Sequence, residues 1–276
     1  MKRFIRPIYF LAILLILDFL LRQGIVAYFI PFKLPAFLTA FVLFTIFAIL
    51  SLVITKWFTK KENTSLSGLG ITFSLKNKRD FLYGFLIGVL LWASVSISQS
   101  WLTGFSWRLE TEINFLNIFL GLIFIFIADL GTEVFTRGYA LTSFKNQWGG
   151  FTAITFMVFF VGLKSYTPNV NGELLFYLML IPALHTVFFS IIYLKTKRLG
   201  GALGVHTGAN FVTISLFDLR PEQSNQLIPE GIFRSNIDFY TVSITILQLP
   251  YVVMAILLSM AVYYWWKRTQ ARPFMK

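Results

Sequence analysis

The sequence has no cysteine among its 276 residues, and it is poor in charge, with only 13% Asp, Glu, Lys and Arg. The lack of cysteine excludes disulfides, thiol nucleophiles, thiolate-bound zinc and iron–sulfur clusters. Soluble domains carry roughly 25% charged residues, so the low charge excludes most soluble architectures. Negatively charged residues are the less frequent kind, with 12 Asp and Glu against 24 Lys and Arg. In a soluble protein this excess of cations would suggest a nucleic-acid partner.

Apolar side chains make up 57% of the chain, and the mean hydropathy is +0.72. Apolar runs of about 18 residues or more recur along the sequence, enough to cross a hydrocarbon core of about 30 Å. We therefore predict an all-α polytopic membrane protein, a bundle of about eight transmembrane helices that forms one domain over residues 1–276. The candidate spans are about 4–30, 35–57, 81–102, 115–137, 150–164, 173–194, 200–217 and 242–266.

The cations are distributed unevenly between the connecting segments. With a cytoplasmic N-terminus, 18 of the 24 Lys and Arg residues lie in inside segments and five in outside segments. This bias follows the positive-inside rule and predicts that both termini are cytoplasmic. It also explains the net charge, since the partners of these cations are lipid headgroups rather than nucleic acid. The composition favours a bacterial plasma membrane.

Ionisable residues inside the predicted spans are few, and each costs roughly 2.5–3.5 kcal/mol on insertion scales. Asp18 and Arg22 lie four residues apart and predict an internal ion pair. Asp129, Glu133 and Arg137 follow one another at i, i+4 and i+8, so they line one helix face. A Glu133–Arg137 pair that only neutralises charge during insertion is the structural alternative to a functional site.

A second polar pair lies in the glycine-rich segment 200–217, where His206 and Asn210 are four residues apart. Small residues let neighbouring helices approach closely. An imidazole and a carboxamide that face a carboxylate on another helix can hold and polarise a water molecule. His185 follows Pro182 and has no comparable neighbours, so we interpret it as a packing residue.

The order of these motifs, Glu133-x-x-x-Arg137-Gly138 and then His206-x-x-x-Asn210, resembles the CPBP family of intramembrane proteases. This family, also called Abi or type II CAAX prenyl endopeptidases, has the motifs EExxxR, FxxxH and HxxxN. The resemblance covers about residues 115–217. It implies that a glutamate and two histidines activate the attacking water, that the asparagine helps to form the oxyanion site, and that Arg137 orients Glu133.

The match departs from the family at two positions. Thr132 stands where the first Glu of EExxxR is expected, and Lys164 follows Phe160 where FxxxH has histidine. Threonine cannot accept a proton near neutral pH, and a lysine ammonium is a donor without an acceptor site. Asp129, one turn from Glu133, is the possible compensating carboxylate. Lys164 could stabilise an oxyanion as a cation, or could form a buried salt bridge with Glu133 or Asp129 instead.

The resemblance also raises the question of zinc, which some descriptions of the family include. Catalytic zinc sites use three protein ligands in most cases. Only Glu133 and His206 are of ligand type at motif positions, so we predict no cofactor and no metal, with zinc disfavoured.

Two classes of function remain open. The first is an endopeptidase that acts on a membrane-associated peptide or protein through Glu133, His206 and Asn210, with Arg137 in support. The second is a catalytically inactive binding or regulatory protein, such as a bacteriocin immunity protein or a partner-protein scaffold. Membership of the family favours the first class, whereas the substitutions at Thr132 and Lys164 favour the second. For both classes we expect Glu133, Lys164, His206 and Asn210 to converge on one cavity.

Overall fold

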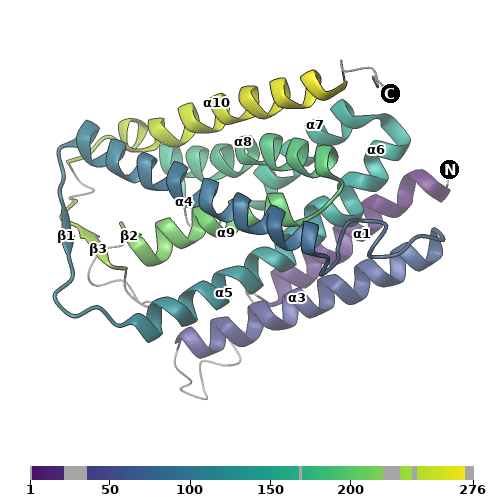
Figure 1. The fold of residues 1–276 in the computed structure, drawn as a ribbon, viewed down its shortest axis with the longest axis horizontal. Coiled ribbons are helices and arrows are strands. Elements are labelled where there is room, and N and C mark those ends of the chain that lie inside the picture. The colour runs from purple at the N-terminus through teal and green to yellow at the C-terminus, as the bar shows by residue number, and fades with distance from the viewer. Residues whose placement is uncertain (1, 22–35, 168–169, 220–230, 238–240, 271–276) are drawn as a thin grey trace.

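The computed structural model describes residues 2–21, 36–167, 170–219, 231–237 and 241–270. It is a bundle of α-helices with one small sheet at an end (Figure 1). The helices are α1 (Lys2–Phe19), α3 (Ala36–Lys61), α4 (Leu75–Thr103), α5 (Phe115–Glu133), α6 (Thr142–Trp148), α7 (Gly150–Lys164), α8 (Gly172–Thr196), α9 (Gly200–Phe211) and α10 (Ile244–Gln270), with π-helices η3 (Val134–Leu141) and η4 (Val212–Leu216).

Five helical segments of the described chain are long and apolar enough to cross a membrane. They are 37–61, 75–103, 115–148, 172–196 and 244–268. The prediction of an all-α multi-pass membrane protein is therefore confirmed. The number of eight spans and the orientation stay predictions. The start of α1 and the end of α10 lie at the same end of the bundle (Figure 1), as two termini on one side of a membrane require.

The helix predicted at 115–137 continues further than its apolar pattern. Helix α5 passes without a break into η3 and then into α6, which ends at Trp148. A π-turn widens the helix by one residue and is most often found near functional sites. All eight residues of η3 are buried, and Arg137 is one of them. The π-turn thus places a guanidinium inside the bundle.

A three-stranded sheet closes one end of the bundle, and the sequence pattern did not predict it. Strand β1 (Trp107–Leu109) pairs antiparallel with β3 (Phe233–Ser235), and β2 (Phe217–Asp218) pairs parallel with β3. The strands have only two or three residues each, too short for a periodic signal. Strand β2 follows η4 directly, so the sheet lies just beyond the helix that carries His206 and Asn210.

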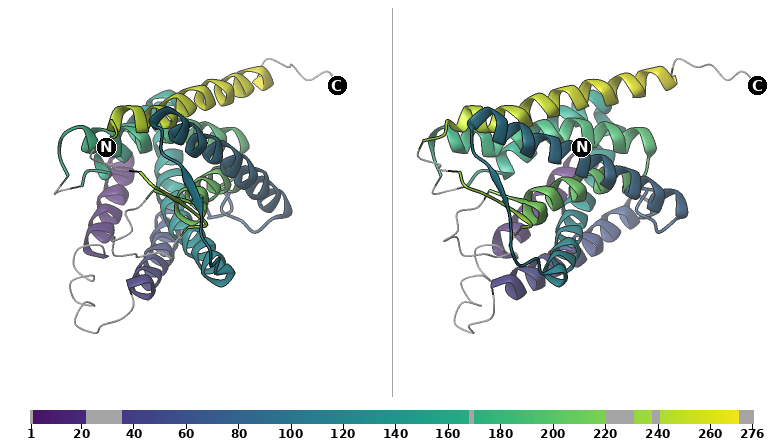
Figure 2. Two further views of the ribbon diagram at one scale, coloured as in Figure 1. Left: turned by 90° about the vertical axis from the view of Figure 1, so that its left-hand side faces the viewer. Right: turned by 60° about the vertical axis from the view of Figure 1, so that its left-hand side comes forward.

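Helix α9 lies in the interior and contacts α4, α5 and α8. Figure 2 shows the same central position from two further directions, with α3 and α5 on one side and α10 on the other. Nine of its twelve residues are buried. A Cβ at Gly204 would lie 2.2 Å from the Phe81 carbonyl oxygen, and one at Gly208 would lie 2.3 Å from that of Phe85. Only glycine allows this approach to α4, which fixes the depth of His206.

Asn77 ties the beginning of α9 to the beginning of α4. Its Oδ1 accepts a hydrogen bond from the Gly200 backbone N–H at 2.6 Å, and its Nδ2 donates to the Thr72 carbonyl at 2.5 Å. The first N–H groups of a helix have no partner inside the helix, so a side-chain acceptor stabilises the start. The position of α9 along α4 is therefore set at both its cap and its glycines.

Candidate active site

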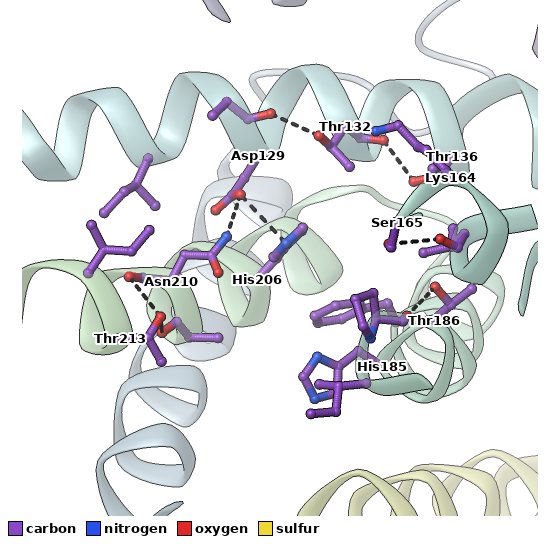
Figure 3. Close-up of a pocket in the computed structure, with 18 of the residues that line it drawn as sticks. Asp129, Thr132, Thr136, Lys164, Ser165, His185, Thr186, His206, Asn210 and Thr213 are labelled. Carbon is purple, nitrogen blue, oxygen red and sulfur yellow. Dashed lines mark hydrogen bonds and ion pairs between the residues drawn. The ribbon is translucent and has the colours of Figure 1, made fainter. Parts of the chain in front are cut away.

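The motif residues converge on a cavity of about 640 Å³ inside the bundle. Among the motif positions, the cavity is lined by Asp129, Thr132, Arg137, Lys164, His206 and Asn210. Figure 3 shows Asp129 pointing toward His206 and Asn210 across the gap between α5 and α9. The volume falls in the range of small-molecule and cofactor pockets, about 300–1,000 Å³, and far exceeds the room that one water needs.

Asp129 forms the centre of the polar wall. Its Oδ1 accepts a hydrogen bond from Asn210 Nδ2 at 2.7 Å and lies 3.6 Å from His206 Nε2. Its Oδ2 is buried and makes no hydrogen bond within the described residues. The carboxylate proposed from sequence as a compensating group thus lies beside both members of the HxxxN motif. The unpaired oxygen is shared with Glu133, since Glu133 Oε2 is likewise buried and makes no hydrogen bond within the described residues.

Glu133 lies on the other side of the same imidazole. Its Oε1 is 2.8 Å from His206 Nδ1 and 3.0 Å from Arg137 Nη1. The residue is 0% exposed and is not among those that line the cavity. The expected proximity of Glu133 and His206 is therefore found. The side chain nevertheless lies behind the imidazole, where a ligand in the cavity does not reach it.

His206 is held between the two carboxylates. Nδ1 faces Glu133 and Nε2 faces Asp129, so an imidazole that carries both protons donates toward each at once. A hydrogen bond to one ring nitrogen fixes the orientation of the ring and the state of the other nitrogen. The His206 side chain is 22% exposed, whereas Glu133 is fully buried. The geometry therefore gives Glu133 the orienting position and leaves the Nε2 edge for the cavity.

Arg137 has more partners than the sequence indicated. Besides Glu133, its Nη1 donates to Thr136 Oγ1 at 2.7 Å and its Nη2 donates to Thr186 Oγ1 at 3.1 Å. Its guanidinium also lies 5.1 Å from the centroid of the Phe189 ring. A buried guanidinium needs several acceptors because its desolvation is costly. Thr186 and Phe189, both from α8, complete the set that holds Arg137.

Thr132 occupies the position of the missing glutamate and lines the cavity. Its hydroxyl donates to the Ala128 carbonyl at 3.1 Å, one turn back along α5. A threonine in a helix often returns its hydroxyl to the i−4 carbonyl in this way. The hydroxyl proton is therefore used within the helix. Asp129, rather than Thr132, supplies a carboxylate to this wall.

Lys164 ends α7 at the cavity wall. Its Nζ is 3.8 Å from Asp18 Oδ2 on α1, and both side chains are mostly buried. The ammonium also lies 5.5 Å from the centroid of the Phe135 ring. The sequence suggested a salt bridge with Glu133 or Asp129, but the structure gives Asp18 as the ion-pair partner. The predicted Asp18–Arg22 pair involves Arg22, which lies outside the described residues.

Sequence reasoning missed three residues of this site. Thr186 and Phe189 hold Arg137 from α8, and Trp92 enters the cavity wall from α4. Thr186 is 0% exposed and lies four residues after Pro182, whose carbonyl oxygen accepts from its hydroxyl at 2.9 Å. A threonine one turn after a helix proline was the available signal, because prolines inside membrane helices are often accompanied by hydroxyl side chains.

The donor set does not fit a zinc ion in this arrangement. Both nitrogens of His206 face carboxylates at hydrogen-bond or ion-pair distances, whereas zinc ligands converge on a point about 2.0–2.2 Å from each. No group of three or more His, Asp or Glu side chains is placed to hold a metal within residues 2–21, 36–167, 170–219, 231–237 and 241–270. The described residues therefore do not form a zinc site in this arrangement.

Residues 114–212 match the family model described as type II CAAX prenyl endopeptidase Rce1-like. The resemblance is confirmed. The matched segment, which we call the Rce1-like core, runs from the start of α5 to the end of α9. It includes the motif positions Thr132, Glu133, Arg137, Lys164, His206 and Asn210. No curated protein and no solved structure matches the chain.

The family match supports a protein of the intramembrane endopeptidase type. The five long apolar helices of the described chain support a multi-pass membrane protein. Within the Rce1-like core, His206 and Asn210 keep the HxxxN motif, and Glu133 and Arg137 keep half of EExxxR. The other two positions, Thr132 and Lys164, are satisfied by contacts elsewhere in the protein.

Proposed function

We propose that the protein is an intramembrane endopeptidase in which Asp129 activates the attacking water and His206 acts as a proton donor. The observation that carries the proposal is the position of Asp129, which lines the cavity beside Asn210 and His206. Glu133, the carboxylate at the motif position, is instead fully buried and engaged by Arg137. The substrate is a membrane-associated peptide or protein.

The proposed chemistry needs only groups of this chain and a water molecule. The Asp129 carboxylate accepts a proton from the water as the water oxygen forms a bond to the carbon of the scissile amide. Negative charge then develops on the former carbonyl oxygen, and the N–H groups of Asn210 and His206 are the donors nearest to stabilise it. When the carbon–nitrogen bond breaks, His206 gives a proton to the leaving nitrogen.

Glu133 and Arg137 act through His206 in this proposal. The hydrogen bond of Glu133 to Nδ1 holds the ring so that Nε2 points at the reacting groups. Arg137 in turn holds Glu133, and Thr186 holds Arg137. This chain of contacts links α5, η3, α8 and α9 and holds the His206 ring in place for the reaction.

A second candidate function is a catalytically inactive binding protein, and a specific observation favours it. Both substituted motif positions are satisfied internally, Thr132 by the Ala128 carbonyl and Lys164 by Asp18. A cavity of about 640 Å³ could then hold a peptide or a segment of a partner membrane protein without cutting it. Bacteriocin immunity or partner scaffolding are the activities of this class.

The experiment that separates the two uses the full chain, purified in detergent, with a membrane-anchored peptide reporter in H₂¹⁸O. The endopeptidase proposal expects cleavage, with ¹⁸O in the new carboxylate, and a loss of at least about 100-fold in His206→Ala. The matched control is Asp80→Asn. The Asp80 side chain is 16% exposed, compared with 22% for His206, and it pairs with Arg198 outside the cavity. This variant is expected to retain activity within about twofold.

If no reporter is cut by the unmodified protein, while Thr132→Glu combined with Lys164→His gains cleavage, the inactive class is correct. Equal loss in His206→Ala and Asp80→Asn would also contradict the proposed site. We also propose a bacterial plasma membrane, which the composition favours, with both termini inside, which the cation bias favours. Cysteine labelling near Lys61 and Arg108 from each side tests that orientation.

A further inference from the structure

The cavity has a second end that the proposed chemistry does not use. Besides Asp129 and His206, its lining includes Trp92, His185, Phe189 and Tyr251, together with Pro182, and of these Phe189 packs against His206. These residues come from three helices, α4, α8 and α10. Figure 3 shows His185 on a different wall from Asp129, His206 and Asn210. We call this part, defined by Trp92, Pro182, His185, Phe189 and Tyr251, the aromatic end.

His185 is surrounded by rings. Its centroid lies 5.0 Å from Trp92 at an interplanar angle of 68°, 5.5 Å from Phe188 and 6.2 Å from Phe189. These edge-on and tilted contacts are the arrangements that aromatic pairs prefer. They hold the imidazole in one orientation at the wall of the cavity.

The imidazole has no hydrogen-bond partner in the part of the chain that the structure describes. Its Nε2 is buried and unpaired, and no bond to Nδ1 is found there either. Buried polar groups are paired in the large majority of cases, so each exception needs an explanation. A packing role alone, as the sequence suggested, would be served better by phenylalanine, which would avoid the unpaired nitrogens. The unpaired imidazole at a cavity wall therefore indicates a ligand group that hydrogen-bonds to it.

The aromatic end is directly connected to the proposed catalytic groups. Phe189 lies between them, because its ring centroid is 5.1 Å from that of His206 and 6.2 Å from that of His185. A ligand group in the aromatic end would thus lie about one side chain away from the amide bond that the activated water attacks. That relation is the one between a specificity pocket and a scissile bond.

We propose that the aromatic end is a binding subsite for a tyrosine side chain of the peptide ligand, next to the position of cleavage. The phenol ring packs edge-on against Trp92, Phe189 and Tyr251, and the hydroxyl bonds to the imidazole of His185. The identity of the ligand as a peptide rests on the proposed function. The preference for a flat ring with a hydroxyl rests on the wall residues alone.

The test is a binding measurement that needs no cleavage. The full chain in detergent is titrated calorimetrically with acetyl-Ala-Tyr-Ala-amide and with the peptides that carry Phe or Leu in place of Tyr. The tyrosine peptide is expected to bind about tenfold more tightly than the phenylalanine peptide, because the latter leaves the imidazole unpaired. The leucine peptide is expected to bind more weakly than either.

His185→Phe keeps a ring and removes both nitrogens. In this variant the tyrosine and phenylalanine peptides are expected to bind equally, within about twofold. Phe159→Leu, on the exposed face of α7 and outside this cavity, is the matched control and should keep the tenfold preference. Tyrosine and phenylalanine peptides that bind equally to the unmodified protein, or a preference that survives in His185→Phe, would overturn the subsite.

A second variant keeps the proposal testable if His185→Phe does not fold. Trp92→Leu removes the ring that faces His185 and is expected to reduce binding of both aromatic peptides to the level of the leucine peptide. An unchanged aromatic preference in Trp92→Leu would contradict the proposal. Retained binding without cleavage would refute the endopeptidase alone, and cleavage without a tyrosine preference would refute the subsite alone.

Discussion

The two substituted motif positions, Thr132 on α5 and Lys164 on α7, lie in the same cavity but in different surroundings. Next to Thr132, the same helix supplies Asp129 one turn away, and that carboxylate contacts Asn210 and lies beside His206. Next to Lys164, the neighbouring helix α1 supplies Asp18 as an ion-pair partner. Under the proposed function, Asp129 supplies the reactive carboxylate on α5. On α7, Lys164 is instead a cation paired with Asp18.

The comparison teaches that a missing motif residue does not by itself decide whether a site is lost. The polar wall of α5 and α9 keeps a carboxylate, an imidazole and a carboxamide within hydrogen-bonding or ion-pair reach. The wall at α7 keeps none of the family's chemistry at the position of Lys164. We therefore expect substitutions at the first wall to have larger effects than those at the second.

The largest expected effect on stability is at Glu133, behind the first wall. Glu133→Gln leaves the Arg137 guanidinium, 3% exposed, without its carboxylate, and breaking a buried ion pair from one side costs about 3–5 kcal/mol. The free energy of unfolding in detergent measures this loss. Asp80→Asn, in the more exposed pair with Arg198, is the control and is expected to cost about 0–1 kcal/mol. A similar loss in both variants would contradict the distinction.

Thr186→Val is expected to have the next largest effect. It removes the hydroxyl that accepts from Arg137 Nη2 and keeps the side-chain shape, so a buried donor loses its partner at a cost of about 1–3 kcal/mol. The same unfolding measurement reports it. Combining Thr186→Val with Glu133→Gln should cost less than the sum of the two, because both act on Arg137. Strict additivity would mean that the two contacts are independent.

Lys164→Met is expected to have a smaller effect. The variant keeps an unbranched chain in place and removes an ammonium that lies 3.8 Å from the mostly buried Asp18, so the loss of stability is about 1–3 kcal/mol. Cleavage of the reporter should change by less than about threefold. A loss of activity as large as that of His206→Ala would show that the cation acts in the reaction, and the contrast between the two walls would fail.

The smallest effect is expected at Thr132. Thr132→Val removes a hydroxyl whose proton is already used by the Ala128 carbonyl, so stability should change by about 0.5 kcal/mol or less. Activity should stay within about twofold. A severe loss of activity would instead assign the hydroxyl a role that Asp129 does not replace.

Much of the site could be predicted from local spacing. The i, i+4 pattern placed Asp129, Glu133 and Arg137 on one face, and the glycine-rich segment predicted the close packing that brings His206 to them. These features depend on helix geometry, which a sequence expresses directly. The predicted cavity also brings together Lys164, His206 and Asn210 from two further helices.

The remaining features depend on tertiary contacts that carry no periodic signal. Nothing in the local pattern of α7 indicated that Lys164 would meet Asp18, 146 positions earlier in the chain. The burial of Glu133 behind His206 follows from how α5 packs on α9, and the π-helix η3 interrupts a segment that reads as continuous helix. The sheet at the end of the bundle has strands too short to be recognised.

The central claim is that Asp129, and not Glu133, is the carboxylate that reacts. The most direct measurement compares the rate of reporter cleavage by Asp129→Asn with that by Glu133→Gln, each corrected for its folded fraction. The account predicts that Asp129→Asn lowers the rate per folded molecule by at least about 100-fold with little loss of stability, and that Glu133→Gln acts mainly on stability. An Asp129→Asn protein that folds and cleaves at the unmodified rate would contradict the account.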